Sequence, residues 1–181
     1  KVQQLRESRG LKAADISMHM IFTGNPGTGK TTIARIVAKY LKAIGVLTSG
    51  QLREVSRSEL VGQYVGHTAV LTSNVIKSAI GGVLFIDEAY ALCRDENDMF
   101  GMEAIDTLVK GMEDNRDNLV VILAGYEDEM EDFIRTNPGL KSRFPNQINF
   151  EDYTPEEMYR IAEVTVKSKG YVLAEDCREP L

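Results

Sequence analysis

Residues 24–31 carry the sequence Gly24-Asn25-Pro26-Gly27-Thr28-Gly29-Lys30-Thr31, which fits the pattern G-x-x-x-x-G-K-[ST] at every fixed position. A short apolar run, residues 19–23, precedes it, and residues 30–44 have the apolar spacing of a helix. This order of strand, loop and helix is the setting that a phosphate-binding loop requires. Four restricted positions match by chance in only about one chain in a hundred at ordinary residue frequencies. We therefore interpret residues 24–31 as a phosphate-binding loop.

The residue types of this loop suit a nucleoside triphosphate. The glycines let the backbone bend and aim N–H groups at the phosphates, and the following helix adds the positive end of its dipole. Lys30 is expected to reach the β- and γ-phosphates, and the Thr31 hydroxyl is expected to ligate Mg²⁺. The predicted cofactors are ATP and Mg²⁺, and the residues predicted to contact the nucleotide in this region are Asn25, Pro26, Gly27, Thr28, Gly29, Lys30, Thr31 and Thr32.

A second segment, GVLFIDEA at residues 82–89, predicts that the nucleotide is hydrolysed. It is a hydrophobic strand that ends in Asp87 and Glu88. Alone, such a pattern is more often a strand that ends in a solvated turn. With the phosphate-binding loop upstream, we expect Asp87 to hold Mg²⁺ through water. Glu88 is then placed to orient and polarise the attacking water as the catalytic carboxylate.

Length, composition and charge indicate which classes of protein the chain can belong to. The chain has 181 residues, 43% hydrophobic and 27% charged, as expected for one packed domain with a small appendage, and a net charge of −6 that argues against a nucleic-acid binder. The two cysteines, Cys93 and Cys177, lack metal-ligand spacing and indicate reduced thiols in the cytoplasm. No apolar run approaches the roughly 20 residues of a membrane-spanning helix, and no signal-peptide pattern opens the chain. Because it begins at Lys1 and ends abruptly at Leu181, we expect a piece of a longer protein.

Strand and helix patterns alternate along the chain, which predicts an α/β fold with a mostly parallel sheet. Apolar residues Ile33, Val37, Leu41 and Ile44 are expected on one face of the first long helix. Strands are expected at 19–23, 52–56, 82–87, 118–125 and 147–150, helices at 30–44, 68–80, 102–113, 127–137 and from Thr154-Pro155 onward, a polar loop at 94–101 and the end of a helix at Val2 to Ser8.

The motifs together resemble an AAA+ ATPase of the CbxX/CfqX family, which includes red-type Rubisco activases, the sporulation protein SpoVK and type VII secretion ATPases. The resemblance covers residues 9 to about 153. Its phrases are HMIFTGNPGTGKTTIAR, LVGQYVGHTA, GVLFIDEAYAL, FGMEAIDTLVKGMED and VILAGYEDEMEDFIRTNPGLKSRFP.

The resemblance implies a P-loop AAA+ three-layer sandwich with a five-stranded sheet of order 5-1-4-3-2. Residues 1–18 would be a linker and helix end, residues 19–153 the nucleotide-binding core, and residues 154–181 the start of an incomplete helical lid. The full-length protein would form a homo-oligomeric ring, usually a hexamer, that acts on a client protein.

The resemblance also assigns two residues to intersubunit or client contacts. Arg143, in LKSRFP, matches the arginine finger that reaches the nucleotide of a neighbouring subunit; the alternative is a surface arginine that caps strand 147–150. Tyr64, in Tyr64-Val65-Gly66, matches the aromatic pore loop that grips a substrate polypeptide. The alternative for Tyr64 is a ring folded back as a lid on the sheet. Residues 94–101 match a second pore-facing loop, or are plain solvated surface.

The resemblance implies three further assignments. Tyr126 stands where many AAA+ proteins have a polar residue, often Asn, that positions the water. Ile161, on the first lid helix, is expected near the adenine base. Ser56 occupies the place of a residue that restrains the catalytic Glu. We interpret His67 as a loop hydrogen bonder and His19 as a strand-start residue, without a catalytic role for either.

Two functions fit these patterns. The first is an ATP-driven ring that remodels a partner protein, with Tyr64 as the contact. The second is a nucleotide-controlled assembly factor or scaffold of a sporulation or secretion complex, in which no polypeptide is threaded. A DNA-handling clamp loader is disfavoured by the net acidity.

Overall fold

The computed structural model describes residues 17–95, 97–174 and 177. The predicted helix end at Val2 to Ser8 lies outside the described residues, as does most of the predicted linker 1–18. Within the described residues, no helix combines the length and apolar character needed to cross a membrane.

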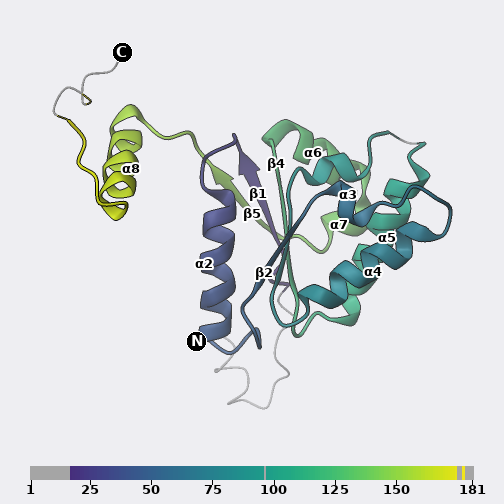
Figure 1. The fold of residues 1–181 in the computed structure, drawn as a ribbon. Coiled ribbons are helices and arrows are strands. Elements are labelled where there is room, and N and C mark those ends of the chain that lie inside the picture. Colours follow the sequence, from purple (N-terminus) through teal and green to yellow (C-terminus); the bar gives the residue numbers. More distant parts are fainter. Residues whose placement is uncertain (1–16, 96, 175–176, 178–181) are drawn as a thin grey trace, which may run out of the picture.

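A five-stranded sheet forms the centre of the fold (Figure 1). Its order is β2-β3-β4-β1-β5 and every neighbouring pair is parallel, which confirms the predicted order 5-1-4-3-2. Every residue of β3 and β4 is buried, as their continuous apolar sequences predict for central parallel strands. The strands are β1 (Met20–Gly24), β2 (Leu52–Val55), β3 (Val83–Ile86), β4 (Val120–Gly125) and β5 (Asn146–Phe150).

Helices cover both faces of the sheet, so the architecture is the predicted three-layer sandwich (Figure 1). The helix α2 packs on one face and the group α3 to α7 on the other. Successive strand residues point to opposite faces, so Leu84 and Ile86 belong to one buried cluster, and Val83 and Phe85 to the other. The helices are α2 (Lys30–Ala43), α3 (Arg57–Leu60), α4 (His67–Ala79), α5 (Met99–Asp114), α6 (Glu127–Thr136), α7 (Pro138–Lys141) and α8 (Pro155–Ser168), with a 3₁₀ turn η1 (Ala89–Leu92).

The face that α2 turns to the sheet differs in part from the prediction: Leu41 is buried and Val37 packs against the core, as expected, but two of the predicted residues are exposed. Ile33 and Ile44, expected inward, are 38% and 53% exposed. The buried residues of α2 are Ala34, Ala38 and Leu41. Small alanine side chains let the helix lie close to the sheet, so the larger apolar residues beside them are left at the surface. Apolar spacing alone did not distinguish the two faces.

The helix α5 begins earlier than predicted, at Met99, and takes over the end of the predicted loop 94–101. Asp98 is its N-cap, and the Asp98 Oδ1 atom accepts a hydrogen bond of 2.9 Å from the Gly101 N–H. A Cβ at Gly101 would lie 2.0 Å from the Leu92 carbonyl oxygen, so this first turn packs directly on η1. Asp98 is therefore a structural residue rather than part of a solvated charge run.

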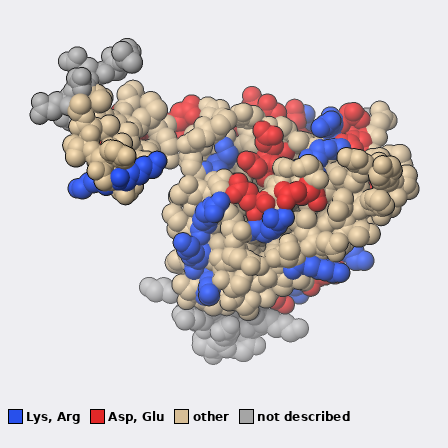
Figure 2. Space-filling model, viewed as in Figure 1, with Lys and Arg blue, Asp and Glu red and all other residues tan. Residues whose placement is uncertain are grey.

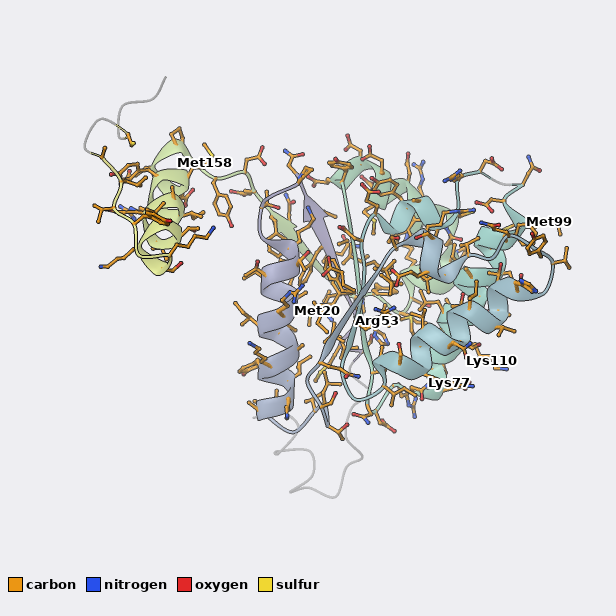
Figure 3. All side chains as sticks on the ribbon, viewed as in Figure 1. Met20, Arg53, Lys77, Met99, Lys110 and Met158 are labelled. Atoms are coloured by element: carbon orange, nitrogen blue, oxygen red, sulfur yellow. The ribbon has the colours of Figure 1, made fainter. Side chains whose placement is uncertain are left out.

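The helix α8 begins as predicted, with Thr154 as N-cap, Pro155 in the first turn and a capping box to Glu157. No residue of α8 is buried, and Met158 is 55% exposed. Figure 3 shows Met158 on a helix that stands apart from the side chains around the sheet. The helix α8 thus starts beside residue 154, and the domain boundary there, like the lid assignment, stays a prediction.

His19 was interpreted as a plain strand-start residue, but the structure gives it a buried role. Its side chain is 6% exposed, and Nδ1 accepts a hydrogen bond of 2.9 Å from the Val121 N–H. Burial, with the nearby Arg143 guanidinium, lowers the pKa of His19 to about 4. The imidazole is therefore neutral in the folded protein.

We expect this neutral imidazole to make stability fall in mild acid. The unfolded chain takes up a proton on His19 below an ordinary pKa of about 6.5, whereas the folded chain resists it down to about 4. The stabilisation is complete above pH about 6.5 and is lost progressively toward pH about 4, by up to about 3 kcal/mol. Urea unfolding across this pH range measures the effect. In His19→Gln, which keeps an acceptor for Val121, the slope with pH should be smaller; an equal slope in both proteins would contradict the prediction.

Candidate functional site

A cavity of about 360 Å³ lies at the carboxyl ends of β1, β3 and β4. It brings together the predicted phosphate-binding loop and the two predicted acids. The loop and the acids are far apart in the sequence. The residues that line it are Gly24, Pro26, Gly27, Gly29, Lys30, Thr31, Thr32, Asp87, Glu88, Tyr90, Gly125 and Tyr126. The carboxyl edge of an open parallel sheet is where α/β folds place their ligands.

The loop backbone is bent at two glycines that face the cavity. Gly27 and Gly29 have φ of 82° and 93°, in the left-handed region that side chains disfavour. Gly29 is also the N-cap position of α2, and no side chain among the described residues caps that helix end. The N–H groups of the first helical turn, which a helix leaves without internal partners, are thus available to an anion.

Lys30 lies across the loop. Its Nζ atom donates to the carbonyl oxygens of Gly24 at 2.6 Å and Asn25 at 2.8 Å. Burial lowers the pKa of Lys30, and the Asp87 carboxylate acts in the opposite direction. The ammonium is therefore held at the cavity by two carbonyl groups and faces one of the two acids.

Asp87 and Glu88 follow β3 directly, and their backbone is fixed on both sides. The Asp87 N–H donates to the Val55 carbonyl of β2 at 3.0 Å, and the Ala91 N–H donates to the Glu88 carbonyl at 2.8 Å. Glu88 has φ 48°, and it is the one non-glycine residue with positive φ in the described part of the chain. A left-handed glutamate is uncommon and unfavourable, and such conformations concentrate at functional sites. The turn at Glu88 directs this acid toward the cavity.

The groups around the cavity fit a triphosphate with a divalent cation. Backbone N–H groups and the Lys30 ammonium suit phosphate oxygens, and the Thr31 hydroxyl and Asp87 carboxylate are oxygen ligands that suit Mg²⁺. Among the described residues, no group of three or more His, Cys, Asp or Glu could hold a metal alone. That is compatible with Mg²⁺, which proteins usually bind through one or two carboxylates together with substrate phosphates.

Two tyrosines complete the wall opposite the loop. Tyr126 lines the cavity at the N-cap position of α6, and its ring centroid lies 6.1 Å from that of Tyr90. Sequence reasoning missed Tyr90. Its place two positions after Glu88, in the turn η1, could have indicated it. Burial and the Glu88 carboxylate raise the pKa of Tyr90, so its hydroxyl stays protonated and can donate a hydrogen bond.

Three predicted nucleotide contacts do not line the cavity. Asn25 donates from Nδ2 to both Asp152 carboxylate oxygens, at 3.0 and 2.8 Å. Thr28 is 5% exposed, and its hydroxyl donates to the Asn25 carbonyl at 2.7 Å. Ile161 is 45% exposed on α8, away from the cavity. The side chains of Asn25 and Thr28 thus make hydrogen bonds that hold the loop in place. Ile161 does not line the cavity.

Arg143 lies at the opposite end of the sheet, just before β5 and beside the residues that precede β1. Its guanidinium donates to the Gly139 carbonyl at 3.1 Å, and Nη2 lies 3.9 Å from Glu113 Oε2. The alternative that it caps strand 147–150 is not what the structure shows, because the bond closes the turn of α7. Arg143 is too far along the sheet to serve the cavity of its own chain, and its action on a neighbouring subunit stays a prediction.

The loop between α3 and α4 presents its aromatic residue to solvent. Tyr64 is 67% exposed and Val65 is 90% exposed. The Tyr64 ring contacts the His67 ring edge-on, with centroids 5.4 Å apart. The structure therefore differs from the alternative in which Tyr64 folds back as a lid on the sheet. The predicted pore contact stays a prediction.

Arg57 anchors the predicted second loop to α3, and sequence reasoning missed it. Arg57 Nη1 donates to the Asp98 carboxylate at 2.7 Å and to the Ala91 carbonyl at 2.8 Å, and it also contacts the Leu92 carbonyl. This ion pair lowers the pKa of Asp98 to about 2. The side chains are only 20% and 10% exposed, so the contact joins α3, η1 and α5 in the interior.

Ser56 adjoins this ion pair and the acids. It is the N-cap of α3 and forms a capping box with Glu59. A second cavity of about 320 Å³ is lined by Ser56 together with Asp87 and Glu88; its other lining residues are Arg57, Ser58, Val61, Ala91 and Arg94. Ser56 is thus near the Glu88 side of the site, as the resemblance implied, but its role in restraining Glu88 stays a prediction.

The visible surface carries charges of both signs. Figure 2 shows basic side chains along α2 and acidic side chains gathered near the carboxyl ends of the strands.

Comparison with known proteins places this arrangement among nucleotide-hydrolysing enzymes. Residues 20–152 match the "ATPase family associated with various cellular activities (AAA)". The chain is 49% identical over 179 residues to the ribulose bisphosphate carboxylase/oxygenase activase, chloroplastic, of Cyanidioschyzon merolae (strain NIES-3377 / 10D), covering 98% of this chain and 61% of that protein. It is 49% identical over 175 residues to the stage V sporulation protein K of Bacillus subtilis (strain 168), covering 97% of this chain and 54% of that protein.

A solved structure supports the fold alone. The crystal structure of the FIGL-1 AAA domain in complex with ADP superposes with a TM-score of 0.63 at 22% identity, covering 90% of this chain and 53% of that chain. The chain thus spans little more than half the length of the proteins it resembles.

Proposed function

Because the chain belongs to the AAA ATPase family, we propose that it binds ATP with Mg²⁺ in the cavity between the phosphate-binding loop and Asp87–Glu88, and hydrolyses it to ADP and phosphate. One observation carries the proposal. Lys30 and Thr31, from the loop, line the same cavity as Asp87 and Glu88, from the end of β3. A loop that binds phosphate thereby faces a carboxylate able to take a proton from water.

Each residue has a distinct part in the proposed reaction. The N–H groups at the start of α2 and the Lys30 ammonium hold the phosphate oxygens, for which Lys30 exchanges its bonds to Gly24 and Asn25. Thr31 and, through water, Asp87 would hold Mg²⁺, and the ion would supply positive charge against the phosphate oxygens. Glu88 accepts the proton of the attacking water. Tyr126 would donate a hydrogen bond from its hydroxyl to the water or phosphate; that it lines the same cavity supports this role.

The full-length protein is proposed to act as a ring, a hexamer by family resemblance, that remodels a client protein in the cytoplasm. The position of Arg143 supports this, because its guanidinium lies at the opposite end of the sheet from the cavity of its own chain and its side chain is 33% exposed. The exposed Tyr64 and Val65 support a contact with the client, because exposed aromatic and apolar side chains grip polypeptides without sequence preference. One relative with this core is named an activase.

The alternative function is that of an assembly factor or scaffold, and the similarity to a sporulation protein favours it. The sporulation protein is as similar in sequence as the activase, at 49% identity. Under this alternative, ATP binding controls the assembly of a complex and no polypeptide is threaded through the ring.

Replacing Tyr64 with Ala separates the two functions. In the full-length protein, we expect the stimulation of ATPase activity by a permanently unfolded probe, reduced and carboxymethylated lactalbumin, to fall about tenfold, because the aromatic contact surface is lost. Basal ATPase activity should stay within about twofold. Tyr40→Ala, which removes a tyrosine of similar exposure on α2, is the matched control and should change neither quantity. If stimulation in Tyr64→Ala equals that of the unaltered protein, the scaffold function is favoured.

A further inference from the structure

The segment that joins β5 to α8 is hydrogen-bonded to the phosphate-binding loop. The Tyr153 hydroxyl donates to the Thr28 carbonyl at 2.9 Å. One residue earlier, the Asp152 carboxylate accepts both bonds from Asn25. Two neighbouring residues after β5 thus hold two residues of the loop. None of the roles described above uses Tyr153, although it contacts the loop directly.

The Tyr153 contact fixes the direction of one N–H group of the loop. Thr28 and Gly29 share a planar trans peptide unit, in which the carbonyl and the following N–H point in opposite directions. The Thr28 carbonyl points to Tyr153, which does not line the cavity. The Gly29 N–H therefore points away from Tyr153, and Gly29 itself lines the cavity.

The surrounding contacts show which side chain can hold the Thr28–Gly29 peptide in one orientation. A Cβ on Gly29 would lie 3.1 Å from the Tyr153 hydroxyl oxygen, so the tyrosine packs closely on the outer side of the loop. Gly29 has φ 93°, and glycine in this region has no side chain to hold the peptide unit in one orientation. The Thr28 side chain is occupied with the Asn25 carbonyl. Among the described residues, Tyr153 is thus the side chain that restrains the Thr28–Gly29 peptide, from the side of the loop away from the cavity.

We propose that Tyr153 is a positioning residue for phosphate: its hydroxyl orients the Thr28–Gly29 peptide so that the Gly29 N–H faces the phosphates of a bound nucleotide. The inference rests on the proposed function, because it requires a phosphate in the cavity. Tyr153 acts through the loop backbone and touches neither the phosphate nor the base.

The test is Tyr153→Phe, which removes only the hydroxyl. Affinities of the whole protein for ADP and for pyrophosphate are measured by competition against a fluorescent ADP analogue. A neutral hydrogen bond contributes roughly 0.5–1.5 kcal/mol, so we expect both dissociation constants to rise about threefold to tenfold. The KM for ATP should rise by a similar factor while kcat stays within about twofold. Tyr40→Phe, a change of the same atom on exposed α2, should leave all of these values unaltered.

The outcomes separate this inference from the proposed function. If the unaltered protein binds neither ADP nor pyrophosphate, the proposed function fails. If it binds both and Tyr153→Phe binds them equally well, only the positioning role is overturned. A loss for ADP without a loss for pyrophosphate also overturns it, because the tyrosine would then contact the base. An equal melting temperature for Tyr153→Phe and the unaltered protein, each without nucleotide, shows that a weaker affinity does not come from a damaged fold.

Discussion

Glu88→Gln keeps ATP bound and lowers kcat by about a hundredfold or more. The amide has nearly the shape of the carboxylate, so the cavity and the turn at φ 48° are preserved, but an amide does not accept the proton of the attacking water. General base catalysis is typically worth about 10²–10⁴-fold in rate. Binding rests on other groups, chiefly the loop N–H groups and Lys30, so the dissociation constant for ATP should change by no more than about twofold.

The measurement uses the full-length, assembled protein. Phosphate release gives kcat, and retention of radiolabelled ATP on a filter gives binding. Glu131→Gln, on the exposed surface of α6, removes the same charge elsewhere and should leave kcat unaltered. Normal hydrolysis by Glu88→Gln would show that another group activates the water.

Asp98→Ala destabilises the fold by about 3–5 kcal/mol, the largest loss of stability that we expect from a single polar side chain here. The change leaves the Arg57 guanidinium in the interior without its carboxylate partner. It also removes the acceptor for the Gly101 and Arg94 N–H groups, so α5 loses its cap. The carboxylate is ionised above pH about 4 in both states, so the loss should be complete at neutral pH.

Urea unfolding of the chain at neutral pH measures this loss. Asp98→Asn keeps a cap acceptor without the charge and should fall between Asp98→Ala and the unaltered protein. Glu54→Ala breaks the exposed ion pair with Arg35, whose side chains are 61% and 43% exposed, and should cost less than about 1 kcal/mol. Equal effects of Asp98→Ala and Glu54→Ala would mean that burial does not strengthen the Arg57–Asp98 pair.

The sequence indicated the parts of the fold that depend on local patterns. Continuous apolar runs predicted the buried strands β3 and β4, and the glycine-rich loop predicted where α2 begins. Family resemblance supplied the order of the sheet, which alternation of strands and helices alone leaves open. The meeting of Lys30 with Asp87 and Glu88 was predicted from the two motifs themselves, because parallel strands bring their carboxyl ends to one edge of a sheet.

Other features depend on contacts between distant segments and had no local signal. The pair Arg57–Asp98 joins α3 to a segment, 94–101, that looks like a solvated polar loop in the sequence. Tyr153 follows an edge strand and precedes a capping box, so nothing nearby indicates its bond to Thr28. The prediction for α2 was right for Leu41 and wrong for Ile33, because close approach to the sheet favours the small side chains of Ala34 and Ala38. Each depends on tertiary packing rather than on spacing along one element.

The separation of Arg143 from the cavity constrains the symmetry of any assembly in which the arginine of one subunit contacts the cavity of another. A donor at the amino end of the sheet and an acceptor at its carboxyl end form two different surfaces of one subunit. A two-fold dimer joins identical surfaces and would leave this pairing unmade, whereas head-to-tail contacts repeat it at each junction. Such contacts close into a circle or continue as a helical filament, and every member then gives an arginine to one neighbour and receives one from the other.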